Sequence, residues 1–225
     1  MTRWQAVVLG ATLVLHAPVA ASQTPPADAL ERAARRYRTA VSVRATFEQT
    51  LTSPDTKSSR LAAGEFLQRG KNHFALRFTD PAGDAIVNDG EFVWVYLPST
   101  AKGQVMQIPQ SAGAGLDFFS ELLTAPREHY EVATRPDETI SGHATSVFAL
   151  TPRKATAPFT RATLWVGTND AALWQLETVE PSGLVRRLHF SSVRFDVALP
   201  KGALTFAVPP GVRVIDQAAM LGGKP

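Results

Sequence analysis

The sequence of 225 residues contains no cysteine. Without thiols the chain cannot form disulfides, thiolate metal sites or a cysteine nucleophile, and it cannot carry a lipidated N-terminal cysteine. A long hydrophobic run is missing too. The apolar stretch at residues 7–15 stops at His16 and is shorter than the roughly 20 residues that a spanning helix needs. The chain is therefore expected to be soluble.

Motifs for catalysis and metal binding are also missing. The five histidines show no metal-binding spacing, and the sequence has no Gly-x-Ser-x-Gly elbow, phosphate loop or dinucleotide fingerprint. Asp80 and Asp84 are candidates for a carboxylate pair, but both lie in a predicted turn, where Asp is favoured for backbone reasons. The sequence therefore predicts a protein that is not an enzyme and has no cofactor or metal. An exported hydrolase is the alternative.

The charges are mixed rather than clustered. The formal net charge is +3, and residues of both signs alternate along the chain. No basic stripe of the kind that nucleic-acid binding needs is present. The small positive excess either favours transient docking to acidic partners or serves only solubility.

The N-terminus has the pattern of an export signal. Arg3 supplies a positive charge, residues 7–15 are apolar, and small residues at 19–21 form a cleavage site. Residues 1–21 are therefore predicted to be a cleavable signal peptide, with an uncleaved anchor as the alternative. Residues 22–225 are predicted to form a single domain, because β architectures of roughly 200–250 residues can build one core.

Two segments have helical spacing. Asp28 is a typical N-cap for a helix over residues 28–41, whose apolar positions run from Leu30 to Val41. Residues 116–123 form the second helix, which ends at Ala125-Pro126. Between and after them lie short alternating strands separated by turn residues. They are expected at residues 43–51, 61–69, 74–78, 86–87, 92–97, 105–108, 129–134, 145–151, 160–166, 172–179, 184–195 and 204–208.

This order of elements predicts a mostly β fold. Many short antiparallel strands in meander order form a strongly curved sheet or open barrel, and the two isolated helices bury their apolar faces on its concave side. Large apolar residues would face this interior. They are Phe47, Phe66, Phe74, Leu76, Phe78, Trp94 and Phe119, with Phe118 and Trp165 as further candidates.

Two interpretations of this interior remain open. It is either a filled hydrophobic core or a cavity that holds acyl chains, as β-barrels can hold ligands. Each buried methylene contributes about 0.8 kcal/mol, so a few acyl chains would bind tightly without specific polar contacts. Periodicity alone does not separate the two interpretations.

Local matches in a fixed order give a resemblance to a known family. Residues 45–50 (Ala-Thr-Phe-Glu-Gln-Thr) contain a Phe-x-Gln-Thr stretch, and residues 64–66 (Gly-Glu-Phe) open the next strand. Residues 74–81 follow, and residues 86–96 contain Ile-Val-Asn-Asp-Gly and Val-Trp-Val-Tyr. Residues 204–216 close the series. In this order the matches resemble the LolA family of periplasmic lipoprotein carriers over residues 28–217.

The resemblance implies a fold and a transport cycle. The fold is an unclosed antiparallel barrel, in which residues 28–41 and 116–123 would be lid helices over an apolar cavity. An inner-membrane ABC transporter of the LolCDE type would load a lipoprotein's acyl chains into a monomeric carrier. The carrier would cross the periplasm and deliver them to the outer membrane, where some organisms use a LolB-type receptor. The alternative is a sensing module with the same fold.

The family also implies an arginine that ties down the lid. An ungapped count from Gly64 to Phe74 places Gly70 on that position, whereas a slip of one residue places Arg69 there. A guanidinium at Arg69 would donate several hydrogen bonds to helix-end carbonyls and hold the empty lid closed. Arg69→Leu is therefore expected to bind lipid but not to pass it on. The alternative is a solvated arginine at a strand end.

Overall fold

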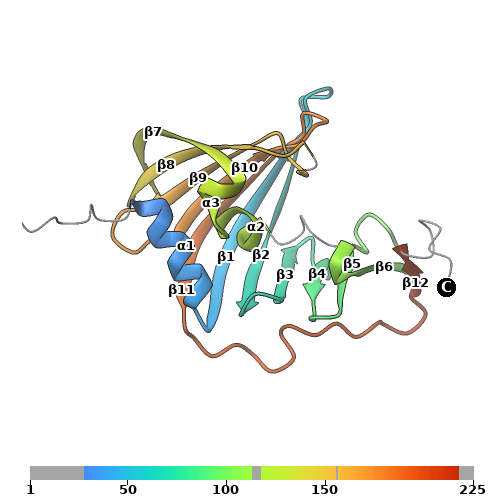
Figure 1. Ribbon diagram of the computed structural model, residues 1–225. Helices are drawn as coiled ribbons and strands as arrows, with labels where there is room; N and C mark the ends of the chain where they lie inside the picture. The colour runs from blue at the N-terminus through green and yellow to red at the C-terminus, as the bar shows by residue number, and fades with distance from the viewer. Residues whose placement is uncertain (1–27, 113–117, 156, 218–225) are drawn as a thin grey trace, which may run out of the picture.

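The computed structural model describes residues 28–112, 118–155 and 157–217. The predicted signal peptide, residues 1–21, lies outside the described residues, as do the first two residues of the predicted second helix, 116–117. Figure 1 shows one large, strongly curved sheet with its helices gathered on one side.

The described residues form one sheet of twelve strands in the order β12-β6-β5-β4-β3-β2-β1-β11-β10-β9-β8-β7. The strands are β1 (Ser42–Thr52), β2 (Ser59–Arg69), β3 (His73–Asp80), β4 (Ala85–Asn88), β5 (Phe92–Tyr96), β6 (Gln104–Pro109), β7 (Tyr130–Ile140), β8 (His143–Pro152), β9 (Arg161–Gly167), β10 (Leu173–Val179), β11 (Val185–Phe195) and β12 (Arg213–Asp216). Each strand is antiparallel to its neighbours except β12, which runs parallel to β6.

The sheet does not close into a barrel. In the part of the chain that the structure describes, β7 and β12 are the two edge strands, and they do not pair with each other. The two meanders meet where β1 pairs with β11 along nearly their whole length. This arrangement confirms the predicted mostly β fold with an unclosed, curved sheet (Figure 1).

The first helix, α1 (Ala29–Thr39), begins as predicted and ends earlier. Asp28 is the N-cap, and its side chain accepts a hydrogen bond from the backbone N–H of Glu31 at 2.9 Å. The predicted end at residue 41 is wrong, because Ala40 is already extended and Val41 is 72% exposed. The residues that α1 buries, from Leu30 to Tyr37, face the concave side of the sheet.

The second helical segment holds one helix more than predicted. The described residues contain α2 (Phe118–Leu123) and α3 (Pro126–His129), preceded by a 3-10 turn, η1 (Gln110–Ala112). Ala125 adopts a left-handed conformation and ends α2 as expected. Pro126 then begins α3, because proline is favoured at the first helical position, where its missing N–H costs no hydrogen bond.

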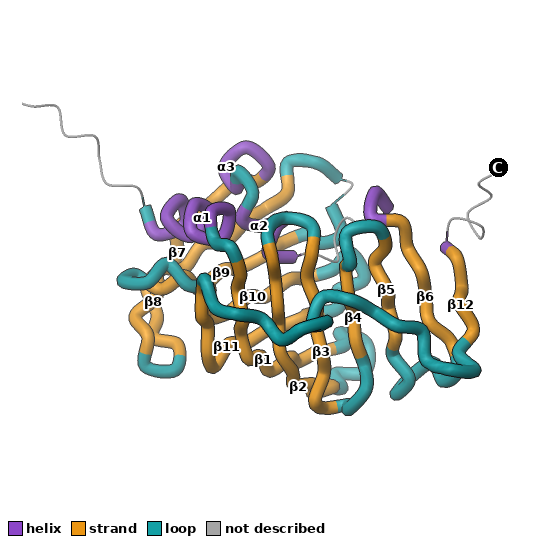
Figure 2. Tube along the Cα trace, turned by 90° about the horizontal axis from the view of Figure 1, so that it is seen from below, coloured by secondary structure: helices purple, strands orange, loops and turns teal. Residues whose placement is uncertain are grey.

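The chain between β11 and β12 crosses the outer face of the sheet. The predicted strand at residues 204–208 is wrong, since this segment pairs with no strand and forms turns and extended chain. Leu204 packs on the outward side chains of β2 to β4, among them Leu67 and Val87. We call residues 197–212 the strap; Figure 2 shows it running across several strands toward β12.

Candidate functional site

The concave face of the sheet carries a continuous apolar cluster under the helices. Five of the predicted interior residues are buried in it, and Phe78 packs against its edge. The five buried residues are Phe47, Phe66, Phe74, Leu76 and Phe119. Phe47 and Phe78 make an edge-to-face contact with ring centroids 5.5 Å apart. The structure therefore brings six of the seven predicted residues together on one face.

Trp94 lies apart from these six residues. Its neighbours in β5, Val93 and Val95, face the concave cluster, so the indole of Trp94 faces the opposite side of the sheet. There it stacks on Phe206 of the strap with ring centroids 5.4 Å apart. Its Nε1 also donates a hydrogen bond to Asp89 at 2.7 Å. Trp165, a further candidate, also faces outward, because its neighbours in β9 are buried in the concave cluster.

Helix α2 fills the space that the acyl-chain interpretation assigns to cargo. The ring of Phe119 stacks on Phe66 with centroids 4.0 Å apart and meets Phe190 at 5.4 Å. Leu122 and Leu123, on the same helix, are also buried. A void of about 20 Å³ lies beside Phe119 and Tyr37. In this conformation the interior is packed by the protein's own lid.

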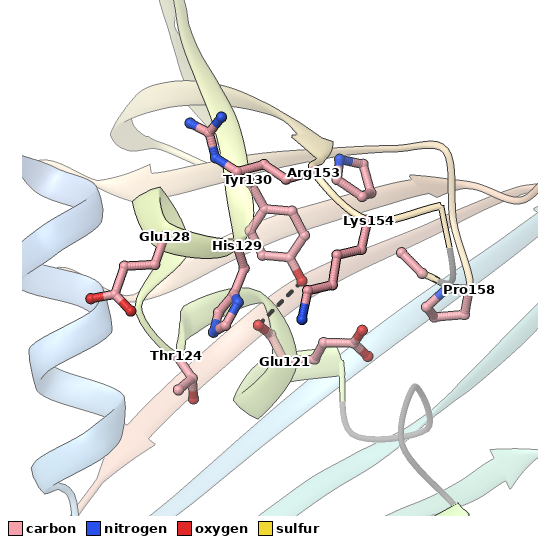
Figure 3. A pocket seen from close by; sticks show the side chains of 10 residues that line it. Glu121, Thr124, Glu128, His129, Tyr130, Arg153, Lys154 and Pro158 are labelled. Atoms are coloured by element: carbon pink, nitrogen blue, oxygen red, sulfur yellow. Dashed lines mark hydrogen bonds between the residues drawn. The ribbon is translucent and has the colours of Figure 1, made fainter.

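A larger pocket opens next to α2. It has a volume of about 400 Å³ and lies between α2, α3 and the beginning of β7 on one side and the end of β8 on the other. Figure 3 shows the ring of Tyr130 at its centre, with Lys154 and Pro158 on the opposite wall. The hydroxyl of Tyr130 donates to the backbone carbonyl of Glu121 at 3.3 Å, which ties the pocket wall to α2.

The two lid helices are attached in different ways. Arg32 of α1 donates to the carbonyl of Thr168 at 2.8 Å, and the hydroxyl of Tyr37 accepts from the backbone N–H of Leu173 at 3.1 Å. Burial raises the pKa of the Tyr37 hydroxyl above its ordinary value. Helix α1 is thus fastened to the sheet by these polar contacts in addition to its buried apolar side chains. The attachment of α2 is dominated by its buried apolar side chains.

An ionic contact joins the two helical segments. Arg127 of α3 forms an ion pair with Asp28, the N-cap of α1, and a second one with Glu31 at 3.4 Å. We call Arg127, Asp28 and Glu31 the helix clasp. No sequence motif pointed to this contact, because it depends on how two helices almost a hundred residues apart pack together.

Arg69 lies at the exposed end of β2, where its backbone pairs with Ser42 and His73. Among the described residues, no helix-end carbonyl accepts a hydrogen bond from its guanidinium. The role of Arg69 as a lid latch stays a prediction. The structure assigns the contact between the helices to Arg127 instead.

Sequence reasoning also missed a polar group on the concave side. Arg186 of β11 donates to the side chain of Gln49 at 3.2 Å and pairs with Glu180 at 3.5 Å. Burial lowers the pKa of Arg186, and the nearby Glu180 partly offsets that effect. Gln49 is the glutamine of the Phe-x-Gln-Thr stretch, and the structure gives it this partner.

Of the two candidate carboxylates, Asp84 has a structural role, whereas Asp80 is the last residue of β3 rather than part of the predicted turn. Asp84 accepts two hydrogen bonds from Ser99, at 3.0 Å from the backbone N–H and at 2.6 Å from the hydroxyl. Both oxygens of Asp84 are therefore engaged in holding two loops together, as the turn interpretation expects. Within the described ranges, no group of three or more His, Asp or Glu residues is placed to hold a metal ion.

An unclosed antiparallel sheet with a helical lid on its apolar concave face defines a class of open-barrel proteins. The family described as "Outer membrane lipoprotein carrier protein LolA" matches residues 38–207 of the chain. This match covers most of the sequence. The chain belongs to the LolA family.

Individual relatives agree with this family. The outer-membrane lipoprotein carrier protein of Methylibium petroleiphilum is 32% identical over 174 residues, which cover 77% of this chain and 82% of that protein. The protein of the same name from Alkalilimnicola ehrlichii is 27% identical over 221 residues, covering 97% and 96%. A crystal structure of an uncharacterized conserved protein from Thermus thermophilus has a TM-score of 0.53 and 12% identity, covering 84% and 97%, which shows the fold alone.

In the described part of the chain, no helix is both long and apolar enough to cross a membrane.

Proposed function

We propose that this protein is a periplasmic carrier that binds the acyl chains of lipoproteins on the concave face of its sheet. It receives them from an inner-membrane ABC transporter of the LolCDE type and delivers them to the outer membrane, to a LolB-type receptor where one is present. The protein acts as a monomer and without catalysis. The names of its relatives support the carrier role.

The observation that carries this proposal is the packing of α2. Its buried side chains Phe119, Leu122 and Leu123 occupy the concave face as a ligand would, with flat aromatic and branched aliphatic surface against the sheet. If α2 swings away, it leaves an apolar surface of matching shape. Acyl chains are the natural replacement, since their contacts with such a surface are also non-directional.

The energy balance of this exchange favours loading. Moving α2 exposes three large apolar side chains, each worth about 1.5–3 kcal/mol of burial. An acyl chain recovers about 0.8 kcal/mol for each methylene that it buries. A few long chains therefore exceed the cost of opening the lid. The net free energy of cargo binding is the difference between the free energy gained by burying the acyl chains and the cost of opening the lid. Cargo can therefore be taken up and released again.

The attachments of the helices suggest which part moves. Polar contacts hold α1 to the sheet through Arg32 and Tyr37. The segment with α2 and α3 contacts α1 through the ring pair of Tyr37 and Phe119, whose centroids are 5.8 Å apart, and through the ion pairs of the helix clasp, which are individually weak at the surface. In the proposed cycle α1 stays in place while α2 and α3 move. The pocket beside Tyr130 is where the lid begins to open.

The test is a fluorescence titration in which a triacylated lipopeptide displaces an environment-sensitive dye from the purified chain. Saturable, stoichiometric displacement is expected. Phe74→Glu should weaken it at least tenfold, because Phe74 is only 1% exposed and the variant places an ionisable group in the apolar interior. Leu61→Glu is the matched control, since Leu61 is 74% exposed.

Circular dichroism should first show that both variants are folded. If the folded wild-type chain binds no lipopeptide, the interior is a permanent core and the carrier proposal fails. Equal weakening in Phe74→Glu and Leu61→Glu would place the binding surface elsewhere. The predicted role of Arg69 needs a second assay, in which loaded Arg69→Leu protein is mixed with acceptor membranes and lipopeptide transfer is followed.

A further inference from the structure

A second hollow lies on the outer face of the sheet, opposite the helices. It has a volume of about 360 Å³ and is lined by residues of β7, β8, β9, β10 and β11. Its floor is formed by Val147, Ala149 and Trp165, which are 2%, 8% and 8% exposed. Apolar side chains this deeply set on the outer face of a sheet form a recessed surface.

The strand register explains how this hollow is built. Val147 of β8 pairs with Trp165 of β9 and with Arg135 of β7, so these three side chains form a row across the outer face. Beyond Arg135 the ladder of β7 and β8 shifts register, and the bulge contains Pro136. The irregular part of β7 overhangs the floor, since Glu138 accepts a hydrogen bond from Nε1 of Trp165 at 3.1 Å.

The charges around the hollow are unevenly satisfied. The two acidic residues of the lining differ: Glu177 pairs with Arg187 at 2.6 Å, whereas Glu138 accepts a hydrogen bond from the neutral indole of Trp165 and keeps its negative charge. Arg135 and Arg161 are different. Within the described residues, neither guanidinium has a hydrogen bond or an ion pair. Two arginines without an acidic partner therefore border an apolar floor.

We propose that this outer hollow binds an acidic segment of a partner polypeptide. A guanidinium forms paired hydrogen bonds with a carboxylate, so Arg135 and Arg161 would each receive an Asp or Glu side chain. The aliphatic part of the segment would lie on the floor of the hollow, where Trp165 and Ala149 are each 8% exposed. The site is on the opposite face from the acyl-chain surface, so a partner can dock there while the interior is loaded.

The recessed shape favours a polypeptide over a membrane. A flat layer of lipid phosphates would meet the protruding arginines but could not reach the indole at the bottom of the hollow. An extended acidic segment can contact both the rim and the floor. Positive surface charge alone does not identify a binding site. The test must therefore separate binding at this hollow from attraction by the net positive charge of the chain.

The experiment titrates a fluorescein-labelled peptide of six glutamates between glycines into the purified full chain at low salt. Binding that weakens with added salt is expected. The double variant Arg135→Gln/Arg161→Gln should reduce affinity about tenfold or more. The control Arg60→Gln/Arg194→Gln removes the same charge from exposed arginines outside the hollow and should keep most of the affinity.

A site-specific readout completes the test. In nitrogen-15 spectra, the peptide should shift the indole signal of Trp165, identified by its loss in Trp165→Phe, and leave that of Trp94 in place. The proposal is overturned if the folded chain does not bind the peptide, if both double variants lose affinity equally, or if the Trp165 signal does not move. It is also overturned if the double variant Arg135→Gln/Arg161→Gln binds the peptide as wild type does and loses only its binding to anionic phosphatidylglycerol vesicles. None of these results depends on acyl-chain binding.

Discussion

At the scale of single residues, Asp89 organises the turn between β4 and β5. Its carboxylate accepts hydrogen bonds from the backbone N–H groups of Glu91 and Phe92 at 3.0 and 2.9 Å, and from Nε1 of Trp94. Partial burial by itself would raise the pKa of Asp89. The hydrogen bonds from Phe92, Trp94 and Glu91 outweigh it and hold the pKa below the ordinary value of 3.8.

This lowered pKa predicts how Asp89 stabilises the fold. A depressed folded pKa gives stability that is present above the unfolded pKa and lost as pH falls through the folded pKa. Asp89→Ala should therefore lower the free energy of unfolding by about 1–2 kcal/mol at neutral pH. The difference from wild type should shrink below about pH 4. Urea unfolding at a series of pH values measures it.

Asp55→Ala is the control for Asp89→Ala, because Asp55 is exposed in the turn between β1 and β2. It should change the free energy of unfolding by less than about 0.5 kcal/mol at any pH. A pH-independent loss in Asp89→Ala would contradict the assigned role of the carboxylate charge.

Trp94 shows why some residues could not be placed from the sequence. Residues 92–96 are apolar at every position, so alternation does not say which side chains face inward. A strand buried on both faces has this pattern. The outer face of β5 is covered by Phe206 of the strap, more than a hundred residues away. In β1 and β3 the alternation is regular, and there Phe47 and Phe74 were placed correctly on the concave face.

At the scale of secondary-structure elements, we expect the helix clasp to set how easily the lid opens in the proposed cycle. Arg127, Asp28 and Glu31 are all about half-exposed, so the ion pairs stabilise the closed lid by no more than about 1 kcal/mol. Arg127→Gln should leave the fold intact and increase the rate of lipopeptide uptake a few-fold. Stopped-flow fluorescence with the dye-loaded protein measures this rate.

The ionic nature of the clasp provides two checks. Added salt should increase the uptake rate of wild type and have a smaller effect on Arg127→Gln, because screening weakens the same pairs. Arg153→Gln is a matched control, since Arg153 borders the same pocket but pairs with Glu131 of β7 rather than with α1. If both variants accelerate uptake equally, the pocket's charge matters and the clasp does not.

At the scale of the whole molecule, local signals determined most of the topology. Consecutive strands pair with each other in both meanders, so turn residues such as Asp89-Gly90 were enough to predict their order. The path after β11 could not be predicted in this way. Residues 204–208 alternate like a strand, but Leu204 packs on the outer face of β2 to β4 and Phe206 stacks on Trp94 of β5. The structure instead forms its last strand at β12, parallel to β6.

Arg77 holds the strap that connects the two distant parts of the sheet. Its Nε donates to the carbonyl of Ala203 at 2.9 Å, and its Nη2 donates to the carbonyl of Thr205 at 2.8 Å. These bonds satisfy backbone groups of a segment that has no strand partner of its own. Because the strap leads into β12, the attachment made by one side chain of β3 affects the far edge of the sheet.

Arg77→Gln should therefore lower the free energy of unfolding by about 1–3 kcal/mol, because it leaves the partly buried carbonyl of Ala203 without its donor. Hydrogen exchange should accelerate at residues 202–216 and stay unchanged in β8 to β11. Arg69→Gln is the control, since Arg69 is exposed at the end of β2 and, in the described part of the chain, its side chain makes no hydrogen bond to residues 202–205. Lipopeptide affinity should be the same in both variants, because the strap and the concave face lie on opposite sides of the sheet. Weaker lipopeptide binding in Arg77→Gln alone would mean that the strap controls the shape of the concave face, and the two sides of the sheet would have to be treated as coupled.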